Sequence, residues 1–283
     1  MIVIKNLKKL YGSKVALDNI NLKLESGNAY GLIGVNGAGK STLINCISGI
    51  IKSYEGSIEI NKGHIGIMPQ DAELDKEFTP LELLNYYYFS TEYGTSKDKK
   101  SKQVLKKAGC SSFINKKIKT LSHGMKRKVA IAQSLLNNPE IIILDEPTAG
   151  LDPKAIIDIR ELINAQRNKN VLLLISSHNA EDIKELCDFL IYVDEGNIKK
   201  FEPINTQKGE KIVYLVLQEY SEKNVELIRK IKSVRNIDAK KKQLKIQLHK
   251  DYSAQELIKD LVKNKILIKE FRESNNMDKL LNK

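Results

Sequence analysis

The sequence predicts an α/β domain over residues 1–204, followed by a small α+β domain over residues 205–283. Short apolar runs recur between helix-like segments through residues 29–193, and they do not alternate with polar residues. Such runs are typical of parallel strands in a sheet that helices cover on both faces. A polar stretch at residues 202–210, which contains a proline and a glycine, predicts the linker between the two domains.

The composition is that of a globular protein with an ordinary core. Of 283 residues, 41% are hydrophobic and 29% are charged, as in most soluble domains. No apolar run approaches the roughly 20 residues of a membrane-spanning helix. The N-terminus has no signal-peptide pattern, so we expect a cytoplasmic protein. The three cysteines lack metal-ligand spacing, which indicates reduced thiols.

The net charge of +12 is unevenly distributed along the chain. Residues 205–283 carry 19 Lys/Arg and 11 Asp/Glu, which is a net charge of +8. A solvated surface, an anionic membrane or a nucleic acid would each suit such a charge. No aromatic residues interleave with the lysines as a nucleic-acid stacking surface requires, so we expect no nucleic-acid partner.

Hydrophobic periodicity and the turn and cap residues predict the elements of the first domain. Thr79-Pro80 begins a helix, because a capping residue precedes a proline at the first helical position. This helix belongs to a predicted helical insertion over residues 75–136. Asp194-Glu195-Gly196-Asn197 predicts a hairpin turn. A second, lysine-rich helix of the insertion is predicted to end at about Ala108. The other predicted helices are Lys40–Ser48, Gly124–Leu136, Pro153–Arg167 and Glu181–Leu186. The predicted strands are 1–9, 19–24, Tyr30–Ile33, Ser57–Ile60, Ile65–Met68, Ile141–Leu144, Val171–Ser176 and Phe189–Val193.

The second domain is predicted to follow the order βαββαβ, which suggests a ferredoxin-like fold. Ser253-Ala254-Gln255-Glu256 is a predicted capping box at the start of its second helix. The predicted elements are strands at Ile212–Leu217, Val234–Ala239, Leu244–Leu248 and Ile266–Phe271, and helices at Ser221–Lys232 and Ser253–Asn264.

A phosphate-binding loop is predicted at Gly34-Val35-Asn36-Gly37-Ala38-Gly39-Lys40-Ser41. Glycines allow backbone N–H groups to approach phosphate oxygens, and the following helix adds the positive end of its dipole. In this motif Lys40 reaches the β- and γ-phosphates and Ser41 binds Mg²⁺. A chance match is disfavoured, because the turn lies between a predicted strand and a predicted helix.

Two acidic residues follow the buried strand Ile141–Leu144, at the point where an open α/β sheet places its ligand-binding crevice. We expect Asp145 to hold Mg²⁺, mostly through water or Ser41, and Glu146 to polarise the attacking water. An isolated Asp-Glu pair after a strand is usually a solvated turn. Its place downstream of a phosphate-binding loop favours the catalytic interpretation.

The segment Leu121-Ser122-His123-Gly124-Met125 stands at the start of another predicted helix. The N-terminus of a helix presents unpaired N–H groups and a positive dipole end to an anion. Considered alone, Ser122 would be an N-cap that serves only its own helix.

The order of these motifs resembles that of ATP-binding cassette (ABC) ATPases over residues 1–201. The phosphate-binding loop, the Leu-Ser-His-Gly-Met segment, Ile-Ile-Ile-Leu-Asp-Glu-Pro and Ala-Gly-Leu-Asp follow one another as in that family. The resemblance implies that Ser122 and Gly124 meet the γ-phosphate of ATP bound to another copy. It also implies that Asp152 lies in a loop that links the two sites of a dimer.

The segment Leu121–Met125 corresponds to the signature of the ABC family, which usually reads Leu-Ser-Gly-Gly-Gln. Two of its residues depart from that pattern. His123 and Met125 replace a glycine and a glutamine, whereas Ser122 and Gly124 are retained. Methionine before Lys-Arg-Lys resembles the variant found in bacterial drug- and peptide-export ATPases and in their lipid-exporting relatives.

The same resemblance implies roles for single residues outside these motifs. It implies that Gln70 senses Mg²⁺, that His178 contacts the γ-phosphate and that Tyr11 stacks on adenine. Considered alone, Gln70 and His178 would be ordinary loop residues and Tyr11 a packed edge-strand residue. The predicted catalytic residues are Glu146, His178 and Gln70, and the predicted Mg²⁺ ligands are Ser41, Gln70 and Asp145. The predicted ATP-binding residues are Tyr11, Gly34, Asn36, Gly37, Ala38, Gly39, Lys40, Ser41, Thr42, Ser122, Gly124 and Asp152.

An aromatic cluster, Tyr86-Tyr87-Tyr88-Phe89, lies in the predicted helical insertion. Core packing is the favoured interpretation, because four adjacent helical residues cannot all face one side. The resemblance implies that the insertion holds a groove for the coupling helix of a membrane subunit, which one or two of these residues would face.

The function that the resemblance implies is that of the ATP-binding and ATP-hydrolysing subunit of a bacterial exporter. Its expected partners are an integral membrane (permease) subunit and a second nucleotide-binding subunit, either a copy of this chain or a paralogue. The expected location is the inner face of the cell membrane. An importer ATPase with a regulatory tail is one alternative. A non-transport ABC protein acting on ribosomes or DNA is another, which the single phosphate-binding loop and the lack of sustained heptads disfavour.

Overall fold

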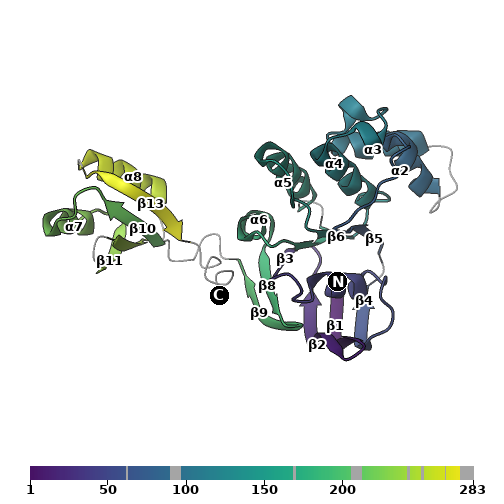
Figure 1. Cartoon of the computed structure of the whole chain (residues 1–283), viewed down its shortest axis with the longest axis horizontal. Helices are drawn as coiled ribbons and strands as arrows, with labels where there is room; N and C mark the ends of the chain where they lie inside the picture. The colour runs from purple at the N-terminus through teal and green to yellow at the C-terminus, as the bar shows by residue number, and fades with distance from the viewer. Residues whose placement is uncertain are drawn as a thin grey trace. The chain divides into compact units, whose positions relative to one another are not determined.

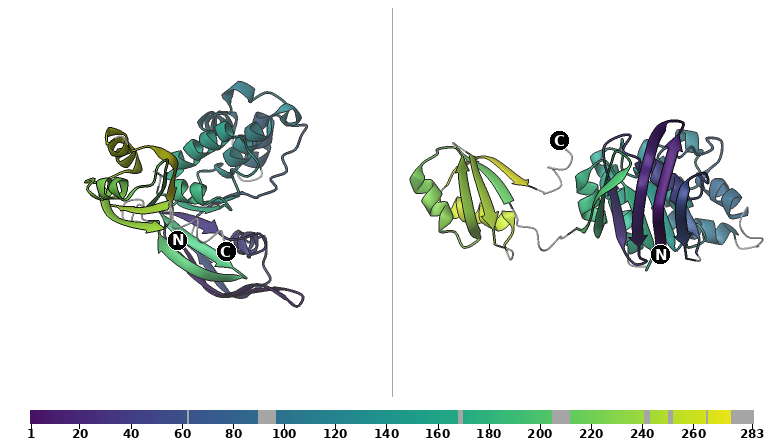
Figure 2. Two further views of the ribbon diagram at one scale, coloured as in Figure 1. Left: turned by 60° about the vertical axis from the view of Figure 1, so that its left-hand side comes forward. Right: turned by 90° about the horizontal axis from the view of Figure 1, so that it is seen from below.

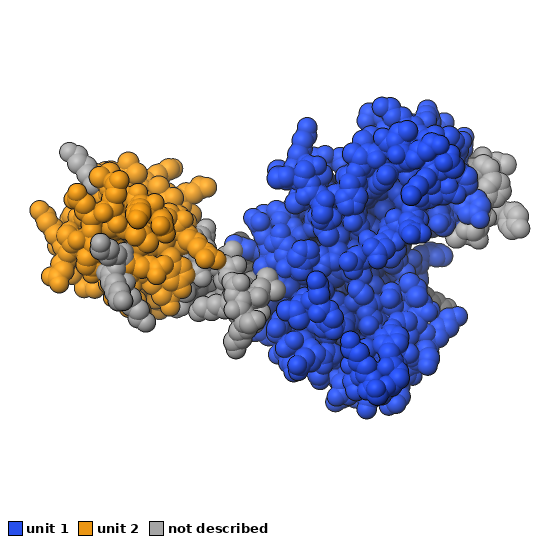
Figure 3. Space-filling view, in the orientation of Figure 1, with its two compact units in different colours: residues 1–204 blue, residues 205–283 orange. Residues whose placement is uncertain are grey.

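The computed structural model divides the chain into two compact units, Met1–Ile204 and Asn205–Lys283 (Figure 3). Among the described residues, no helix is both long and apolar enough to cross a membrane. The residues that the structure describes are 1–61, 63–89, 97–167, 170–204, 212–240, 243–249, 252–264 and 266–274.

A six-stranded sheet forms the centre of unit 1. Its strand order is β5-β6-β7-β3-β8-β9, and all neighbours are parallel except β8 and β9. The carboxyl ends of the parallel strands therefore meet at one edge, where open α/β sheets bind their ligands. The strands are β3 (Ala29–Ile33), β5 (Ile65–Met68), β6 (Ile141–Asp145), β7 (Leu172–Ser176), β8 (Phe189–Asp194) and β9 (Asn197–Pro203).

A three-stranded antiparallel sheet, in the order β2-β1-β4, shares its core with the central sheet (Figure 2). Helix α1 (Lys40–Ile47) belongs to the same core, because its Leu43, Ile44 and Ile47 are buried in one cluster with residues of both sheets. The strands of the smaller sheet are β1 (Ile2–Tyr11), β2 (Lys14–Leu24) and β4 (Glu55–Ile60).

Helices cover the other side of the six-stranded sheet. Figure 1 shows α4, α5 and α6 on the side away from β1 and β2, with α2 and α3 beside α4. The helical insertion is thereby placed next to β5 and β6, close to the carboxyl edge. The helices are α2 (Pro80–Phe89), α3 (Lys97–Lys107), α4 (His123–Ser134), α5 (Pro153–Arg167) and α6 (Ala180–Leu186), with 3₁₀ turns at Ser111–Phe113 and Ile118–Thr120.

The observed elements of unit 1 differ from the predicted ones mainly at their ends. β1 extends to Tyr11 and β2 begins at Lys14, which pairs with Tyr11. These extensions flank the turn at Gly12 and Ser13, and pairing between the two strands, such as Leu10 with Val15, stabilises them. Helix α4 begins at His123, one residue earlier than predicted, because the Ser122 side chain caps it. The predicted hairpin turn at Glu195 and Gly196 is confirmed, with positive φ at both residues.

Unit 2 has the predicted element order and an antiparallel sheet with strand order β11-β12-β10-β13. Alternate strand residues such as Val213, Leu215 and Ile246 form a buried core with Ile228 and Leu257 of the helices. The predicted capping box is confirmed, since Ser253 and Glu256 exchange backbone-to-side-chain hydrogen bonds. The elements are β10 (Ile212–Leu217), α7 (Glu222–Arg229), β11 (Val234–Lys240), β12 (Gln243–Leu248), α8 (Ala254–Lys263) and β13 (Ile268–Ser274).

Candidate nucleotide-binding and catalytic site

The predicted phosphate-binding loop connects the carboxyl end of β3 to the first turn of α1. The Nζ of Lys40 donates hydrogen bonds to the carbonyls of Gly34, at 2.7 Å, and Val35, at 3.2 Å. Helix α1 begins after Gly39, and no side chain caps its first N–H groups. The N-terminus of α1 and the Lys40 ammonium therefore offer donors to an anion, as bound phosphates require.

Two glycines of this loop are needed for different physical reasons. A Cβ at Gly34 would lie 2.2 Å from the backbone oxygen of Val193, so no side chain fits there. Gly37 has φ of +82° and nothing within 4 Å of its Cβ position, so its constraint is the left-handed backbone. In the same loop Asn36 is exposed and Ala38 buried, while Ser41 and Thr42 in the first turn of α1 are half-buried.

Asp145 and Ser176 form a buried pair at the carboxyl ends of neighbouring strands. They are register partners of β6 and β7, and the Ser176 hydroxyl donates a hydrogen bond to Asp145 Oδ1. The same hydroxyl oxygen accepts the N–H of Glu146 at 2.9 Å. Ser176 therefore orients both acidic residues. Sequence analysis did not assign it this role, although a polar residue ending an otherwise apolar strand was a usable signal.

The predicted catalytic residues Glu146 and His178 are in direct contact. Glu146 Oε2 lies 2.7 Å from His178 Nδ1. Glu146 is 5% exposed and has a φ of +51°, which turns its side chain to a different direction from that of Asp145. An ionised carboxylate only accepts hydrogen bonds, so Nδ1 of His178 carries the proton in this contact.

Gln70 lies at the start of the segment that follows β5, beside the buried Arg127 of α4. Arg127 is 9% exposed, and its Nη1 donates a hydrogen bond to the Gln70 backbone oxygen at 3.2 Å. Burial lowers the pKa of Arg127, while the charges of Asp71 and Glu146 act in the opposite direction. The exposed Gln70 side chain itself has no direct contact with Asp145 or Ser41 among the described interactions. Sequence analysis gave Arg127 no role, because its burial depends on the path of a distant loop.

The predicted signature and dimer-loop residues lie at the N-termini of α4 and α5. Ser122 caps α4 by accepting the N–H of Met125 at 3.3 Å, and Asp152 caps α5 by accepting the N–H of Ala155 at 3.0 Å. The two helices are close at Gly124, where a Cβ would lie 3.0 Å from that of Ala155. The local N-cap interpretation of Ser122 is thus correct, and it leaves Gly124 and the remaining N–H groups at the helix start for an external anion.

Tyr11 stands at the exposed end of β1. Its side chain is 52% exposed, so it is not a packed edge-strand residue. The Lys9 ammonium lies 5.0 Å from the centre of its ring. The ring is therefore accessible for stacking.

A buried ion-pair network supports the loop that carries Glu146. Asp182 is 1% exposed and accepts hydrogen bonds from the Arg160 guanidinium at 2.8 and 2.6 Å. Its other oxygen accepts from Thr148 and from Ser177. Burial alone would lower the pKa of Arg160, but the hydrogen bonds and charge of Asp182 outweigh it, and the pKa is raised. The segments after β6 and β7 are thereby held together.

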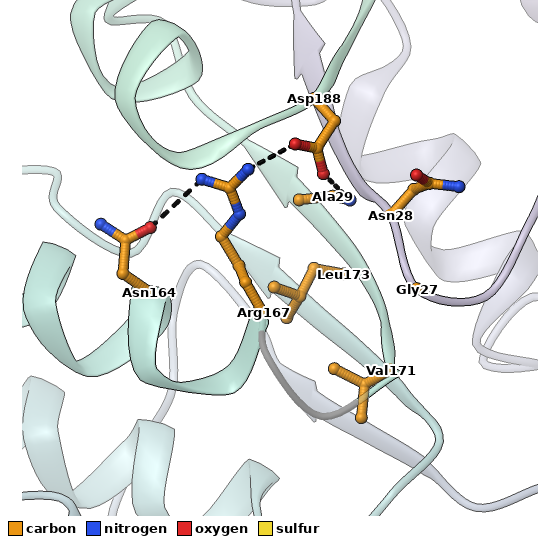
Figure 4. A pocket seen from close by; sticks show the side chains of 8 residues that line it. All are labelled: Gly27, Asn28, Ala29, Asn164, Arg167, Val171, Leu173 and Asp188. Carbon is orange, nitrogen blue, oxygen red and sulfur yellow. Dashed lines mark hydrogen bonds and ion pairs between the residues drawn. The ribbon is translucent and has the colours of Figure 1, made fainter.

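A cavity of about 340 Å³ lies at the opposite, amino-terminal ends of β3 and β7. Figure 4 shows Arg167 reaching Asp188 across it, while Asp188 accepts the N–H of Ala29 at 2.8 Å. These polar groups satisfy one another. Because the cavity lies at the amino-terminal ends of the strands, it is separate from the residues predicted to bind nucleotide, which lie at the carboxyl edge.

The residues at the carboxyl edge fit a nucleotide-bound Mg²⁺ better than a protein-only metal site. Within the described residues, no group of three or more His, Cys, Asp or Glu side chains could hold a metal ion. Asp145 and Ser41 supply hard oxygen atoms, and Mg²⁺ is commonly bound by one or two such groups together with substrate phosphates. This arrangement suits an ion that arrives with ATP.

A parallel sheet with a phosphate-binding loop after β3 and an acidic pair after β6 defines a P-loop nucleoside triphosphatase. The family model described as "ABC transporter" matches residues 17–149. The linearmycin resistance ATP-binding protein LnrL of Bacillus subtilis is 31% identical in an alignment 265 residues long, which covers 88% of this chain and 85% of that protein. The chain therefore belongs to the ABC transporter family.

Other relatives and solved structures agree with this assignment. The lantibiotic transport ATP-binding protein SrtF of Streptococcus pyogenes is 36% identical over 207 residues, covering 70% of this chain and 89% of that protein. The bacitracin transport ATP-binding protein BcrA of Bacillus licheniformis is 34% identical, covering 75% and 73%. The dimeric ATP-binding cassette MJ0796, solved with ADP and Pi, superposes with a TM-score of 0.67 at 28% identity, covering 74% of this chain and all of that one. The predicted resemblance to export-type ABC ATPases, the mixed α/β P-loop fold and the ATP hydrolase class are confirmed.

Proposed function

We propose that this chain energises the export of a drug, peptide or similar cargo by binding and hydrolysing ATP for a separate membrane subunit. The observation that carries the proposal is the contact of Glu146 with His178 beside the buried Asp145, at the edge where the phosphate-binding loop opens. The names of LnrL, SrtF and BcrA, which concern antibiotic resistance or transport, support export over the importer and ribosome alternatives.

In the proposed mechanism each residue acts on the triphosphate or on the attacking water. Lys40 exchanges its loop carbonyls for phosphate oxygens, and the N-terminus of α1 donates N–H groups to the same anion. Glu146 accepts a hydrogen bond from the attacking water and orients it, while His178 holds the carboxylate and reaches the γ-phosphate. Ser41, Gln70 and Asp145 are the proposed ligands of Mg²⁺, which would neutralise phosphate charge when bound.

The proposed ATP-binding set includes residues that serve a second copy. Tyr11 would stack on adenine with its exposed ring. Ser122 and Gly124 would meet the γ-phosphate of ATP on another nucleotide-binding subunit, and Asp152 would link the two sites. The dimeric state of the MJ0796 cassette supports a pair of this chain, or of this chain with a paralogue, and the proposed arrangement of that pair is head to tail.

The helical insertion is the proposed contact with the membrane subunit. Of its aromatic cluster, Tyr88 is buried at 3% exposure, whereas Tyr86 is 63% and Tyr87 38% exposed; the Phe89 side chain lies outside the described residues. The cluster is thus divided between core and surface, and the two exposed tyrosines are suited to dock a coupling helix. Such docking would place the chain at the inner face of the cell membrane.

Unit 2 is proposed to be a ferredoxin-like accessory domain covering residues 205–283. Its order βαββαβ and its antiparallel sheet β11-β12-β10-β13 support this assignment. Its net charge of +8 would favour an anionic membrane surface. Sedimentation with anionic vesicles tests this role, which is refuted if deletion of residues 205–283 leaves binding unchanged.

The substitution Glu146→Gln tests the catalytic assignment. Glutamine keeps the shape of the side chain but cannot act as a base, so the variant should bind ATP, lose turnover and accumulate as a dimer on sizing columns. Lys40→Ala is the matched control, because it should prevent the ATP-dependent dimer. A Glu146→Gln protein that hydrolyses ATP normally would contradict the assignment.

Copurification tests the transport role. The tagged chain, recovered from gently solubilised membranes, should carry a small integral membrane protein. Recovery with ribosomes or DNA and without a membrane protein would reject the export proposal.

A further inference from the structure

We propose that Arg127 is a positioning residue of the ATPase site, which holds the main chain of Gln70 and couples the signature helix α4 to the catalytic edge. This inference rests on the proposed roles of Gln70 and Glu146. The described hydrogen bond of Arg127 is to the main chain of Gln70 and not to a side chain predicted to bind ATP or Mg²⁺. Arg127 would therefore act through Gln70.

The first argument is the burial of a charged group with few contacts. The guanidinium has five N–H donors and no acceptor. The residue as a whole is 9% exposed, and the hydrogen bond of its guanidinium within the described residues is to the Gln70 carbonyl. A buried cation that is incompletely paired destabilises a fold. A neutral side chain would fill the same space without the free-energy cost of burying a charge. Packing alone therefore does not explain an arginine at this position.

The second argument is the position of Gln70 in the chain. β5 ends at Met68 and α2 begins at Pro80, so Gln70 lies where the chain leaves the central sheet for the helical insertion. Arg127 belongs to α4, which closes that insertion. A hydrogen bond to the Gln70 carbonyl therefore fixes the start of the insertion to its last helix.

The third argument is the charge on the other side of Arg127. The carboxylate of Glu146, at the end of β6, and that of Asp71 both act on the guanidinium. One side chain thus holds the main chain of Gln70 by a hydrogen bond and interacts electrostatically with the proposed catalytic base. Movement of α4 would therefore change the hydrogen bond to Gln70 and the electrostatic interaction with Glu146 at the same time.

The hydrogen bond between Arg127 and Gln70 connects two parts of the proposed dimer site: the edge that binds this chain's own ATP and the start of α4, which would meet ATP on another copy. Ser122 caps the same helix that carries Arg127 five residues later. When Ser122 meets ATP on another copy, the resulting position of α4 would reach Gln70 through the Arg127 hydrogen bond. Arg127 would thus allow Gln70 to respond to a partner's nucleotide.

The test is a substitution series on the full-length chain. Arg127→Met removes the donors and the charge, Arg127→Lys keeps the charge, and Lys102→Met on the exposed surface of α3 is the charge-matched control. Arg127→Met should lower kcat by roughly 10- to 100-fold, with KM for ATP and ATP binding within about twofold, since the ligand-binding groups are untouched. Arg127→Lys should be intermediate, and Lys102→Met should match the wild type.

A double-substitution cycle separates positioning from a general structural role. If Arg127 acts through Gln70, the Gln70→Ala/Arg127→Met protein should be no slower than Gln70→Ala alone. An equal further loss in the Gln70→Ala background, or an unchanged kcat for Arg127→Met, would overturn the proposal.

A second measurement keeps the proposal decidable if Arg127→Met does not fold. Backbone amides at residues 70–72 should exchange hydrogen faster in Arg127→Lys than in the wild type. Wild-type exchange combined with a wild-type kcat in that variant would reject the proposal. Failure of the proposed function itself is distinguishable, because Glu146→Gln would then retain hydrolysis whatever Arg127 does.

Discussion

Glu146 and His178 form a hydrogen-bonded pair, with 2.7 Å between Oε2 and Nδ1. The partners differ in exposure, since the Glu146 side chain is 7% exposed and that of His178 is 61% exposed. The main-chain N–H of Glu146 is held by Ser176, so the residue that carries the buried carboxylate is fixed, whereas the imidazole stands at the surface of the edge. This asymmetry allows their contributions to catalysis and to stability to be separated.

His178→Ala should lower kcat with little effect on folding. We expect a loss of at least roughly 100-fold, the low end for a positioned acid–base group. The free energy of unfolding should change by no more than about 0.5 kcal/mol, because an exposed side chain makes few contacts. Steady-state ATPase assays and thermal unfolding provide the two values. A kcat within twofold of the wild type would show that His178 has no part in turnover.

Several parts of the site could be predicted because they depend on local sequence. The glycine spacing around Lys40, and the acidic pair after an apolar strand, specify their surroundings through a few neighbouring residues. The strand ends were harder to predict. Lys14 directly follows the turn at Gly12 and Ser13, and its pairing with Tyr11 in β1 makes it part of β2.

Other parts depend on contacts between distant segments, which a sequence pattern does not contain. Ser176 orients Asp145 only because β6 and β7 pair in a register that places the two residues side by side. Arg127 was visible as one of several basic residues in a helix. Its burial against Gln70 follows from how the insertion returns to the sheet.

Alanine at Gly34 should mainly impair folding, whereas alanine at Gly37 should mainly impair ATP binding. Gly34→Ala places a Cβ 2.2 Å from the Val193 backbone oxygen, and we expect it to destabilise the fold by about 3 kcal/mol or more. Gly37→Ala has open space and should cost only the roughly 1–2 kcal/mol of a left-handed backbone, while its methyl group obstructs the phosphates. Unfolding and ATP titrations compare the two. Equal stability of both variants would contradict the steric argument.

The buried thiols should make the fold less stable in alkali. Burial raises the pKa of the Cys110 thiol to about 12, whereas a thiol in an unfolded chain ionises near pH 8.5. Between these values the folded protein binds a proton that the unfolded chain has lost, so stability falls as the pH rises. Melting temperatures measured from about pH 8 to pH 11 should fall less steeply for Cys110→Ala than for the wild type. Parallel slopes would refute the assignment, and native Cys110 should also resist alkylation at pH 8.

His123, which departs from the family's usual glycine, should stabilise the nucleotide-bound dimer. Its Nδ1 lies 3.3 Å from the Gly150 backbone oxygen, so the signature segment and the loop leading to Asp152 are connected within one chain. Because a single hydrogen bond contributes about 0.5–1.5 kcal/mol, His123→Ala should raise the ATP concentration for half-maximal dimerisation by roughly 2- to 10-fold. His123 is exposed, so monomer stability should hardly change.

The ATP concentration for half-maximal dimerisation is measured in the Glu146→Gln background, in which the dimer does not dissociate through ATP hydrolysis. His123→Gln is the matched variant, since its amide can donate to the same carbonyl and should restore part of the effect. If His123→Ala dimerises at the same ATP concentration as the parent, the contact with Gly150 does not order the loop. The histidine would then be only a tolerated surface substitution. If both variants weaken dimerisation equally, the ring itself would be what the partner subunit contacts.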